Sequence, residues 1–251
     1  AKLSEDAMTA LSLVYPAQNL LTAVAVGFGV GVNAMISFYL GAQNQEKADK
    51  TATQGIVLGV LHGVLLMLLF LCGMNWFLGM FTKSDAVRAL GMEYSNVVFL
   101  FSVIVTGGIT LEKIFQAVGR MRATMVSMIA GFVTNIVLDP LLIFGIGPFP
   151  RMEIAGAALA TGIGQVITLL VYIIYYVLDP LPVKLRRTYL RPEGEICGKT
   201  YGIGIPATLN MALPSLLISA LNGILAAYSG VYVLVLGVYY KLQTFIYLPS
   251  N

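Results

Sequence analysis

The chain has 251 residues, of which 58% are hydrophobic and 11% are charged. An ordinary soluble domain has about 25% charged residues, so this composition excludes a soluble globular protein. Two cysteines are too few for a disulfide-stabilised scaffold, and the net charge of +3 is less informative than the placement of the charges along the chain.

Long uncharged intervals indicate a polytopic membrane protein built from helices. A helix that crosses about 30 Å of hydrocarbon needs about 20 mostly apolar residues. Six intervals contain no Asp, Glu, Lys or Arg: 7–45, 51–82, 94–111, 123–138, 154–178 and 200–240. They are continuously apolar, whereas the strands of a membrane barrel alternate between apolar and polar residues. With charge clusters and Gly/Pro residues as boundaries, we predict seven spans: 7–40, 53–77, 92–118, 123–147, 154–178, 202–227 and 230–251.

The distribution of Lys and Arg predicts the orientation of these spans. Nine of these residues fall in the connections 41–52, 119–122 and 179–199, and four fall on the opposite side. Positive residues are enriched in cytoplasmic loops, so we expect the nine-charge side in the cytoplasm. The first span then runs inward from outside, and both ends of the chain look cut within a larger fold.

The first two spans contain polar side chains and regularly spaced glycines. Gln18 and Asn19 follow a proline in the first span and are candidates for lining a cavity. In the second span, Gly55, Gly59 and Gly63 recur four residues apart, which allows membrane helices to approach closely. We expect these glycines to serve packing.

Ionisable residues within spans are the strongest functional signals, because each is costly to place in hydrocarbon. Such residues are His62, Glu112, Lys113, Asp139 and Lys241. We interpret His62 as a hydrogen-bonded packing residue.

Glu112 and Lys113 lie toward the predicted cytoplasmic end of span 92–118, where a local ion pair is inexpensive. Gln116 shares a helix face with Glu112, because residues four apart on a helix are neighbours. The pair of Glu112 and Gln116 is therefore a second candidate for lining a cavity.

The spans 123–147 and 154–178 contain the best candidate site. Asp139 lies about 12 Å from the outer end of its helix, with Asn135 one turn away on the same face and a proline directly after it. In the next, antiparallel span, Thr161 and Gln165 fall at similar depth. A carboxylate among amides and hydroxyls at this depth is typical of a proton or Na⁺ site; the structural alternative is an Asp that stabilises a proline kink.

The segment 179–199 is the longest and most basic connection, and it contains three prolines. We interpret it as a cytoplasmic linker between two helical bundles, 1–178 and 200–251. Val-Tyr pairs followed by Gln in 11–27 and 235–251 are a weak internal repeat across the linker. In the last span, Lys241 and the neighbouring Tyr240 are candidates for lining a cavity.

Two segments resemble a known family. Residues 115–165 are similar to the central signature of the multidrug and toxin extrusion (MATE) family, in particular its MepA-like bacterial branch. Their sequence is FQAVGRMRATMVSMIAGFVTNIVLDPLLIFGIGPFPRMEIAGAALATGIGQ. The loop GAQNQEKADK at 41–50 resembles the loop after helix 2 in that family. The resemblance covers helix 2 to helix 8 of twelve.

This resemblance implies an all-α transporter with two six-helix lobes, of which 1–178 is most of the N-lobe and 200–251 is the first two helices of the C-lobe. It also implies that Asn135, Asp139 and Thr161 take part in cation coupling. The acidic residue that some members carry on helix 1 lies outside this sequence. The acidic residue that NorM-type members carry on helix 7 has no counterpart in 201–227.

From these observations we expect a secondary antiporter in a bacterial inner membrane that exports organic cations in exchange for H⁺ or Na⁺. We expect it to be monomeric, with no cofactor, no metal site and no nucleic-acid partner. A lipid-linked oligosaccharide flippase of the same superfamily is the alternative. An intramembrane enzyme is disfavoured, because the sequence has one histidine and no paired aspartates.

Overall fold

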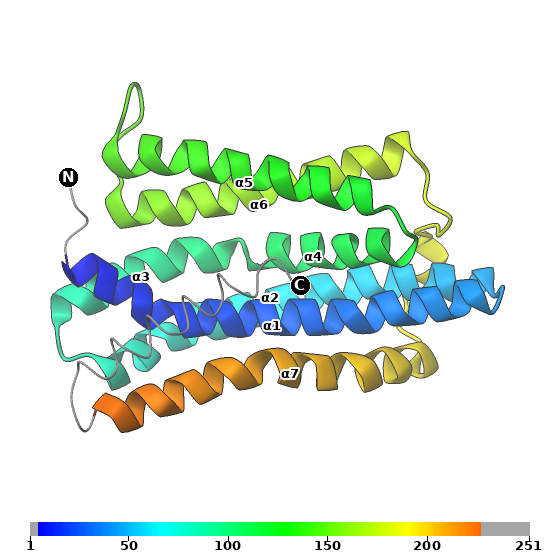
Figure 1. The fold of residues 1–251 in the computed structure, drawn as a ribbon, viewed down its shortest axis with the longest axis horizontal. Coiled ribbons are helices and arrows are strands. Elements are labelled where there is room, and N and C mark those ends of the chain that lie inside the picture. Colours follow the sequence, from blue (N-terminus) through cyan, green and yellow to red (C-terminus); the bar gives the residue numbers. More distant parts are fainter. Residues whose placement is uncertain (1–4, 227–251) are drawn as a thin grey trace. The chain divides into compact units, whose positions relative to one another are not determined.

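A computed structural model describes residues 5–226 of the chain as a bundle of helices (Figure 1). The helices are α1 (Glu5–Gly41), α2 (Gln45–Phe81), α3 (Asp85–Leu100), α4 (Ser102–Ala117), α5 (Met121–Phe144), α6 (Glu153–Leu178), the short 3₁₀ helix η1 (Arg187–Tyr189) and α7 (Gly194–Ala226). The chain divides into two compact units, Ala1–Leu209 and Asn210–Asn251. The predicted span 230–251 lies outside the described residues.

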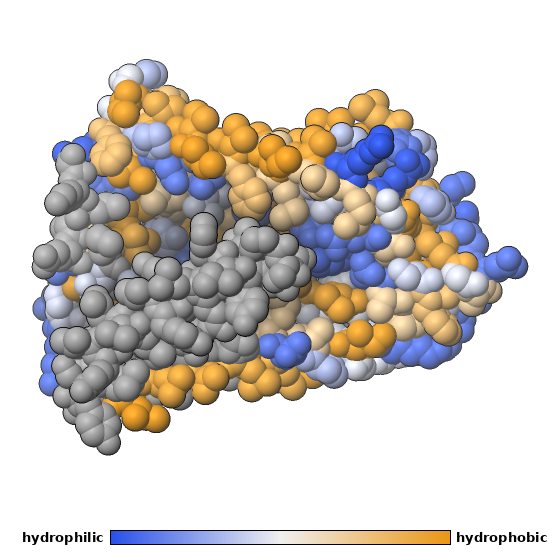
Figure 2. Space-filling view, in the orientation of Figure 1, coloured by the Kyte–Doolittle hydropathy of each residue, from blue (hydrophilic) through white to orange (hydrophobic). Residues whose placement is uncertain are grey.

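Four of these helices, α1, α2, α5 and α6, are long and apolar enough to cross a membrane. They coincide with four predicted spans. Along α5, large apolar side chains such as Ile136 and Ile129 are more than half exposed, and Figure 2 shows apolar surface along the edge formed by this helix. Because such exposure is unfavourable in water and favourable in lipid, the protein is a multi-pass membrane protein.

The predicted span 92–118 is bent, because α3 and α4 are apolar enough to cross a membrane only as a pair. The structure has α3 and α4, which meet at Phe101 with a bend of 45°. The Ser84 hydroxyl caps α3 by accepting a hydrogen bond from the Val87 amide, so the helix begins before the predicted span. The ring of Phe101 lies against Gly162 of α6, where an added Cβ would overlap the ring. Packing of Phe101 into this space accompanies the break in the helix.

The glycine repeat of α2 serves close packing, as predicted. A Cβ atom at Gly59 would overlap the side chain of Thr110, and one at Gly63 would overlap Thr106, both of α4. Both threonine hydroxyls donate to carbonyls of their own helix, so they satisfy their polar groups inside the interface. The two helices can therefore approach without leaving buried polar atoms unpaired.

Ion pairs join the three connections that were predicted to share one side of the membrane. Arg120 pairs with Asp179 at 2.8 Å, and Lys50 pairs with Glu193 at 2.8 Å. The connections after α1, α4 and α6 therefore lie at one end of the bundle. We call it the Arg120 end; its cytoplasmic location stays a prediction.

The segment between α6 and α7 is bound closely to the first turns of α2. Asp49, which is 2% exposed, accepts hydrogen bonds from the Lys184 amide at 2.9 Å and from Gln45. Gln54 donates to the Arg191 carbonyl at 3.0 Å and accepts from the Glu193 amide at 3.1 Å. Since the linker backbone satisfies these buried groups, this segment is an integral part of the described bundle.

Candidate functional site

The helices α5 and α6 pack closely against each other, and the candidate site lies along their interface. Two glycines allow this close approach: a Cβ at Gly164 would lie 2.9 Å from the Gly131 carbonyl oxygen, and one at Gly131 would overlap Thr168. Small residues let membrane helices pack backbone to backbone. The polar side chains that flank these glycines are thereby held opposite one another.

The structure brings together the three residues predicted to couple cations. The Asn135 amide nitrogen lies 3.4 Å from Asp139 Oδ1 and 3.4 Å from Thr161 Oγ1, so it bridges the carboxylate of its own helix and the hydroxyl of α6. Thr161 in turn donates to the Ala157 carbonyl at 3.0 Å, which leaves its oxygen free to accept. Both Asn135 contacts, at 3.4 Å, are long for hydrogen bonds.

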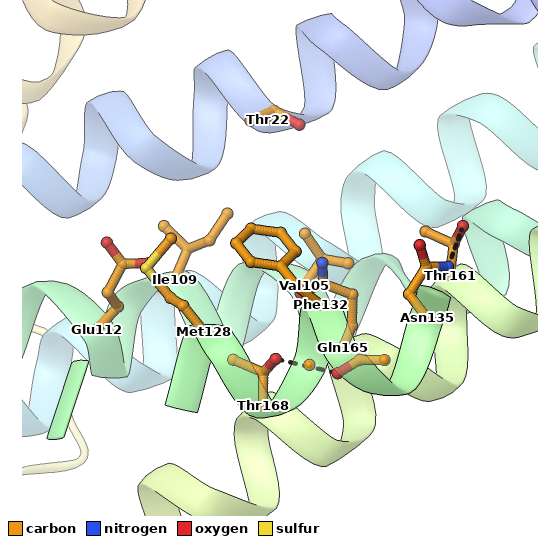
Figure 3. A pocket seen from close by; sticks show the side chains of 12 residues that line it. Thr22, Val105, Ile109, Glu112, Met128, Phe132, Asn135, Thr161, Gln165 and Thr168 are labelled. Carbon is orange, nitrogen blue, oxygen red and sulfur yellow. Dashed lines mark hydrogen bonds between the residues drawn. The ribbon is translucent and has the colours of Figure 1, made fainter. Parts of the chain in front are cut away.

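A cavity of about 230 Å³ extends from this cluster along the interface (Figure 3). Asn135 and Thr161 lie at one end of it, and Glu112 of α4 lies at the other. Gln165, predicted to share the site, lines the cavity between them, beside Phe132. Asp139 contacts the site through Asn135 and does not itself line the cavity.

Glu112 is part of a compact polar cluster on α4. Its carboxylate pairs with Lys113 Nζ at 3.1 Å and accepts from Gln116 Nε2 at 2.8 Å, and Gln116 Oε1 accepts from Lys113 at 3.0 Å. The predicted ion pair and the shared face of Glu112 and Gln116 are confirmed. Of this cluster, Glu112 lines the cavity, so a negative group faces it while the lysine neutralises part of its charge.

The first helix contributes a different residue from those predicted. Gln18 donates to the hydroxyl of Tyr94 at 3.2 Å, and Asn19 is its neighbour on α1. The residue of α1 that lines the cavity is Thr22, one turn further along, whose hydroxyl donates to the Gln18 carbonyl at 3.0 Å. The bond from Gln18 thus joins Tyr94 of α3 to α1.

Sequence reasoning missed Thr22, Tyr94 and Thr168. Thr168 lies seven residues after Thr161 on the same face of α6, so helical spacing alone could have identified it. Tyr94 is placed by the packing of α3 against α1, for which the sequence carries no local signal. The candidates Lys241 and Tyr240 lie outside the described residues. Within residues 5–226, no three His, Cys, Asp or Glu side chains gather in a way that could hold a metal ion.

The sequence of this chain matches a known protein family. The MatE family model matches residues 1–141, which is more than half of the chain. This chain belongs to the MATE family. Members of this family are transporters and not enzymes. The MATE chain is 30% identical to the multidrug export protein MepA of Staphylococcus aureus over 238 residues, which cover 95% of the chain and 52% of MepA.

Solved structures of transporters share the fold. One, an outward-facing conformation of a multidrug resistance MATE family transporter of the MOP superfamily, is 25% identical with a TM-score of 0.86; the match covers 98% of this chain and 53% of the other. A second is a MOP superfamily transporter from Pyrococcus furiosus, described as having a binding pocket of reverse polarity that suggests a different function. It is 25% identical with a TM-score of 0.90, over 98% of this chain and 54% of the other. The chain therefore spans about half the length of the relatives that it matches.

Proposed function

We propose that this MATE protein is a secondary active antiporter of a bacterial inner membrane, which exports a small organic cation in exchange for H⁺ or Na⁺. The observation that carries the proposal is the Asn135 bridge between Asp139 and Thr161 at one end of a cavity in the membrane. The similarity to a multidrug export protein over 95% of the chain supports the drug-export part. We propose that the protein acts as a monomer without a cofactor.

In this proposal Asp139 is the coupling group. A carboxylate placed within hydrocarbon is costly and is found there mainly where it binds ions or protons. When Asp139 is charged, Asn135 donates an amide N–H to its carboxylate, and the Thr161 hydroxyl oxygen, which accepts from the same amide, is available as a further ligand for a cation. When it is protonated, the site no longer attracts a cation. Proton and drug therefore compete, and each weakens the binding of the other by the same coupling free energy.

The volume of the cavity limits the size of the ligand that it can hold. Its volume of about 230 Å³ is below the roughly 300–1,000 Å³ of typical drug sites. We propose that it takes the coupling ion and the cationic part of the substrate. Phe132 offers an aromatic face to such a cation, and Glu112 and Gln165 offer polar groups. Gln116 and Gln18 support the site through their bonds to Glu112 and Tyr94.

The free energy available depends on the coupling ion. If one proton is exchanged for one monovalent drug, the cycle is electroneutral, and each pH unit of gradient supplies about 1.4 kcal/mol. A tenfold accumulation of drug requires the same free energy, so exchange of one proton per drug gives about tenfold accumulation for each pH unit of gradient.

The test is ethidium transport by the full-length protein in liposomes, driven separately by a proton gradient and by a Na⁺ gradient. We expect Asp139→Asn to abolish gradient-driven exchange and to retain dye binding. The matched control is Glu153→Gln, because Glu153 is an exposed carboxylate paired with Arg151 at 2.8 Å, away from the cavity.

The gradient that drives the wild-type protein identifies the coupling ion. Equal exchange rates in Asp139→Asn and Glu153→Gln would overturn the role of Asp139. No dye transport by the wild-type protein under either gradient would overturn drug export and favour the flippase alternative.

A further inference from the structure

Glu112 is the one charged residue among the described residues that line the cavity. It lies at the end away from Asn135 (Figure 3). The two ends are about 10 Å apart, because Met128 and Asn135 of α5 both line the cavity and are two turns apart. An unpaired carboxylate at this place would attract a second positive charge on a substrate whose first charge lies beside Asn135. The charge of Glu112 therefore affects how many positive charges a substrate can carry.

The Glu112 carboxylate is already paired within the protein. Its Oε1 atom accepts hydrogen bonds from Lys113 Nζ at 3.1 Å and from Gln116 Nε2 at 2.8 Å. Gln116 Oε1 accepts from the same lysine at 3.0 Å, so the three side chains form a closed ring. The side chains of Glu112 and Lys113 are only 17% and 15% exposed. Since two close opposite charges largely cancel each other at a distance, the Glu112 end of the cavity is nearly neutral.

Contacts with α1 hold Lys113 in the position from which it reaches Glu112. Consecutive residues on a helix do not face each other, so the lysine side chain does not start in the direction of Glu112. Its Cγ atom lies against Gly29 of α1, where an added Cβ would be 2.7 Å away, and its carbonyl accepts from Asn33 Nδ2 at 3.1 Å. Only the amine turns back to Glu112. Because Lys113 is not among the residues that line the cavity, it acts on a substrate through Glu112.

We propose that Lys113 is a specificity-determining residue, which neutralises Glu112 and thereby makes the cavity select organic cations with one positive charge over those with two. A second charge on the substrate would lose its hydration beside a carboxylate that already has a lysine partner, so the cost of burying it is not offset. This inference rests on the proposed function, because it names the substrate class of the same site. It assigns to Lys113 a role that the proposed function does not use.

Ethidium and propidium provide the test, because they share one aromatic ring system and differ in charge. Ethidium carries one fixed positive charge and propidium carries two, so the charges of the two dyes do not change with pH. The dissociation constant of each dye is measured by fluorescence with the full-length protein in detergent micelles. We expect the wild-type protein to bind ethidium roughly tenfold more tightly than propidium, which corresponds to about 1.4 kcal/mol. Equal or tighter binding of propidium by the wild-type protein overturns the proposal without any variant.

Substitutions at Lys113 and Glu112 change the charge at this end of the cavity in opposite directions. Lys113→Gln leaves Glu112 unpaired, and we expect the preference to shift toward propidium by roughly tenfold. Glu112→Gln leaves Lys113 unpaired and should shift the preference away from propidium. The double variant removes both charges, and Lys113→Arg keeps both, so each should retain the wild-type preference. The matched control is Arg151→Gln, which removes a positive charge from an exposed ion pair with Glu153 and should not change the preference.

A purely structural role of Lys113 predicts a different result. Loss of packing weakens the binding of both dyes alike, so the ratio of the two dissociation constants would stay the same in every variant. The melting temperature of each variant is measured in parallel. If Lys113→Gln does not fold, Glu112→Gln and the wild-type comparison decide the question, because an unpaired Lys113 should weaken the binding of propidium more than that of ethidium.

The outcomes separate this inference from the proposed function. Suppose that the wild-type protein exchanges ethidium in liposomes and that Asp139→Asn does not. If the ratio of dissociation constants is then the same in the wild type, Lys113→Gln and Glu112→Gln, the role of Lys113 is overturned and the proposed function stands. A double variant that prefers propidium as Lys113→Gln does also overturns the role of Lys113. If the wild-type protein neither binds nor exchanges ethidium, both proposals are overturned.

Discussion

Replacing Asp49 tests how strongly the linker is bound to α2. The side chain accepts hydrogen bonds from Gln45 at 2.8 Å and from the Lys184 amide at 2.9 Å, and it lies 3.5 Å from Arg186 Nε. Hydrogen bonds to a charged group contribute about 1.5–3 kcal/mol each, and the half-exposed Arg186 adds about 0–1 kcal/mol. Because Asp49→Ala leaves the Lys184 amide unpaired, we expect the free energy of unfolding to fall by about 3–5 kcal/mol.

Asp49→Asn separates the hydrogen bonds from the charge. Asparagine keeps one carbonyl oxygen for the Lys184 amide and loses the charge opposite Arg186, so we expect a loss of only about 1 kcal/mol. The surface control is Glu46→Ala, whose exposed carboxylate forms an ion pair with Lys50 one turn away; its expected cost is about 0.5 kcal/mol or less.

The assay is the free energy of unfolding in bicelles, measured for each variant by steric trapping, together with trypsin cleavage of the linker. We expect cleavage after Arg186 and Arg187 to accelerate in Asp49→Ala and to stay slow in Glu46→Ala. If Asp49→Ala and Glu46→Ala unfold with the same free energy, the contribution assigned to the buried contacts is refuted.

Two further predictions concern packing and pH. Gly164→Val should destabilise the bundle by about 1–3 kcal/mol, because its Cβ would lie 2.9 Å from the Gly131 carbonyl oxygen. The control is Gly73→Val, where no atom lies within 4 Å of the added Cβ. The melting temperature should fall much less in Gly73→Val than in Gly164→Val. Hydrogen bonds from Lys199 and from Lys47 lower the pKa of Glu195 from 4.5 to about 2. Since the folded-state pKa is the lower one, Glu195 contributes stability above about pH 4.5 that is lost as the pH falls toward 2. The melting temperatures of Glu195→Gln and the wild type should therefore differ at pH 7 and converge near pH 2; a constant difference would contradict this assignment.

The membrane spans could be predicted because a helix that crosses hydrocarbon must consist almost entirely of uncharged, mostly apolar residues. The uncharged intervals at 7–45 and 154–178 correspond to α1 and α6 for this reason. The break at Phe101 could not be predicted, since no proline or glycine lies next to it. It coincides with the packing of Phe101 against Gly162, a residue 61 positions away in the sequence.

Within the site, contacts between residues close in the sequence could be predicted, whereas a contact between distant residues could not. Asn135 and Asp139 are four residues apart on one helix, so their contact follows from helical spacing. The contact of Asn135 with Thr161 follows from depth, because α5 and α6 are antiparallel neighbours joined by a short connection. By contrast, the partner of Gln18 is Tyr94, 76 residues away, and no sequence pattern connects the two.

The bonds between α2 and the linker have a consequence for the order of events during synthesis. The acceptor Asp49 and its donor, the Lys184 amide, are 135 residues apart. At synthesis rates of about 5–20 residues per second, Asp49 is added to the chain roughly 7–27 s before that amide exists. During this interval its carboxylate must remain hydrated at the membrane surface. The first turns of α2 can therefore enter their buried position only after α3 to α6 have been synthesised, so these turns are among the first parts of the chain to be made and among the later parts to be buried.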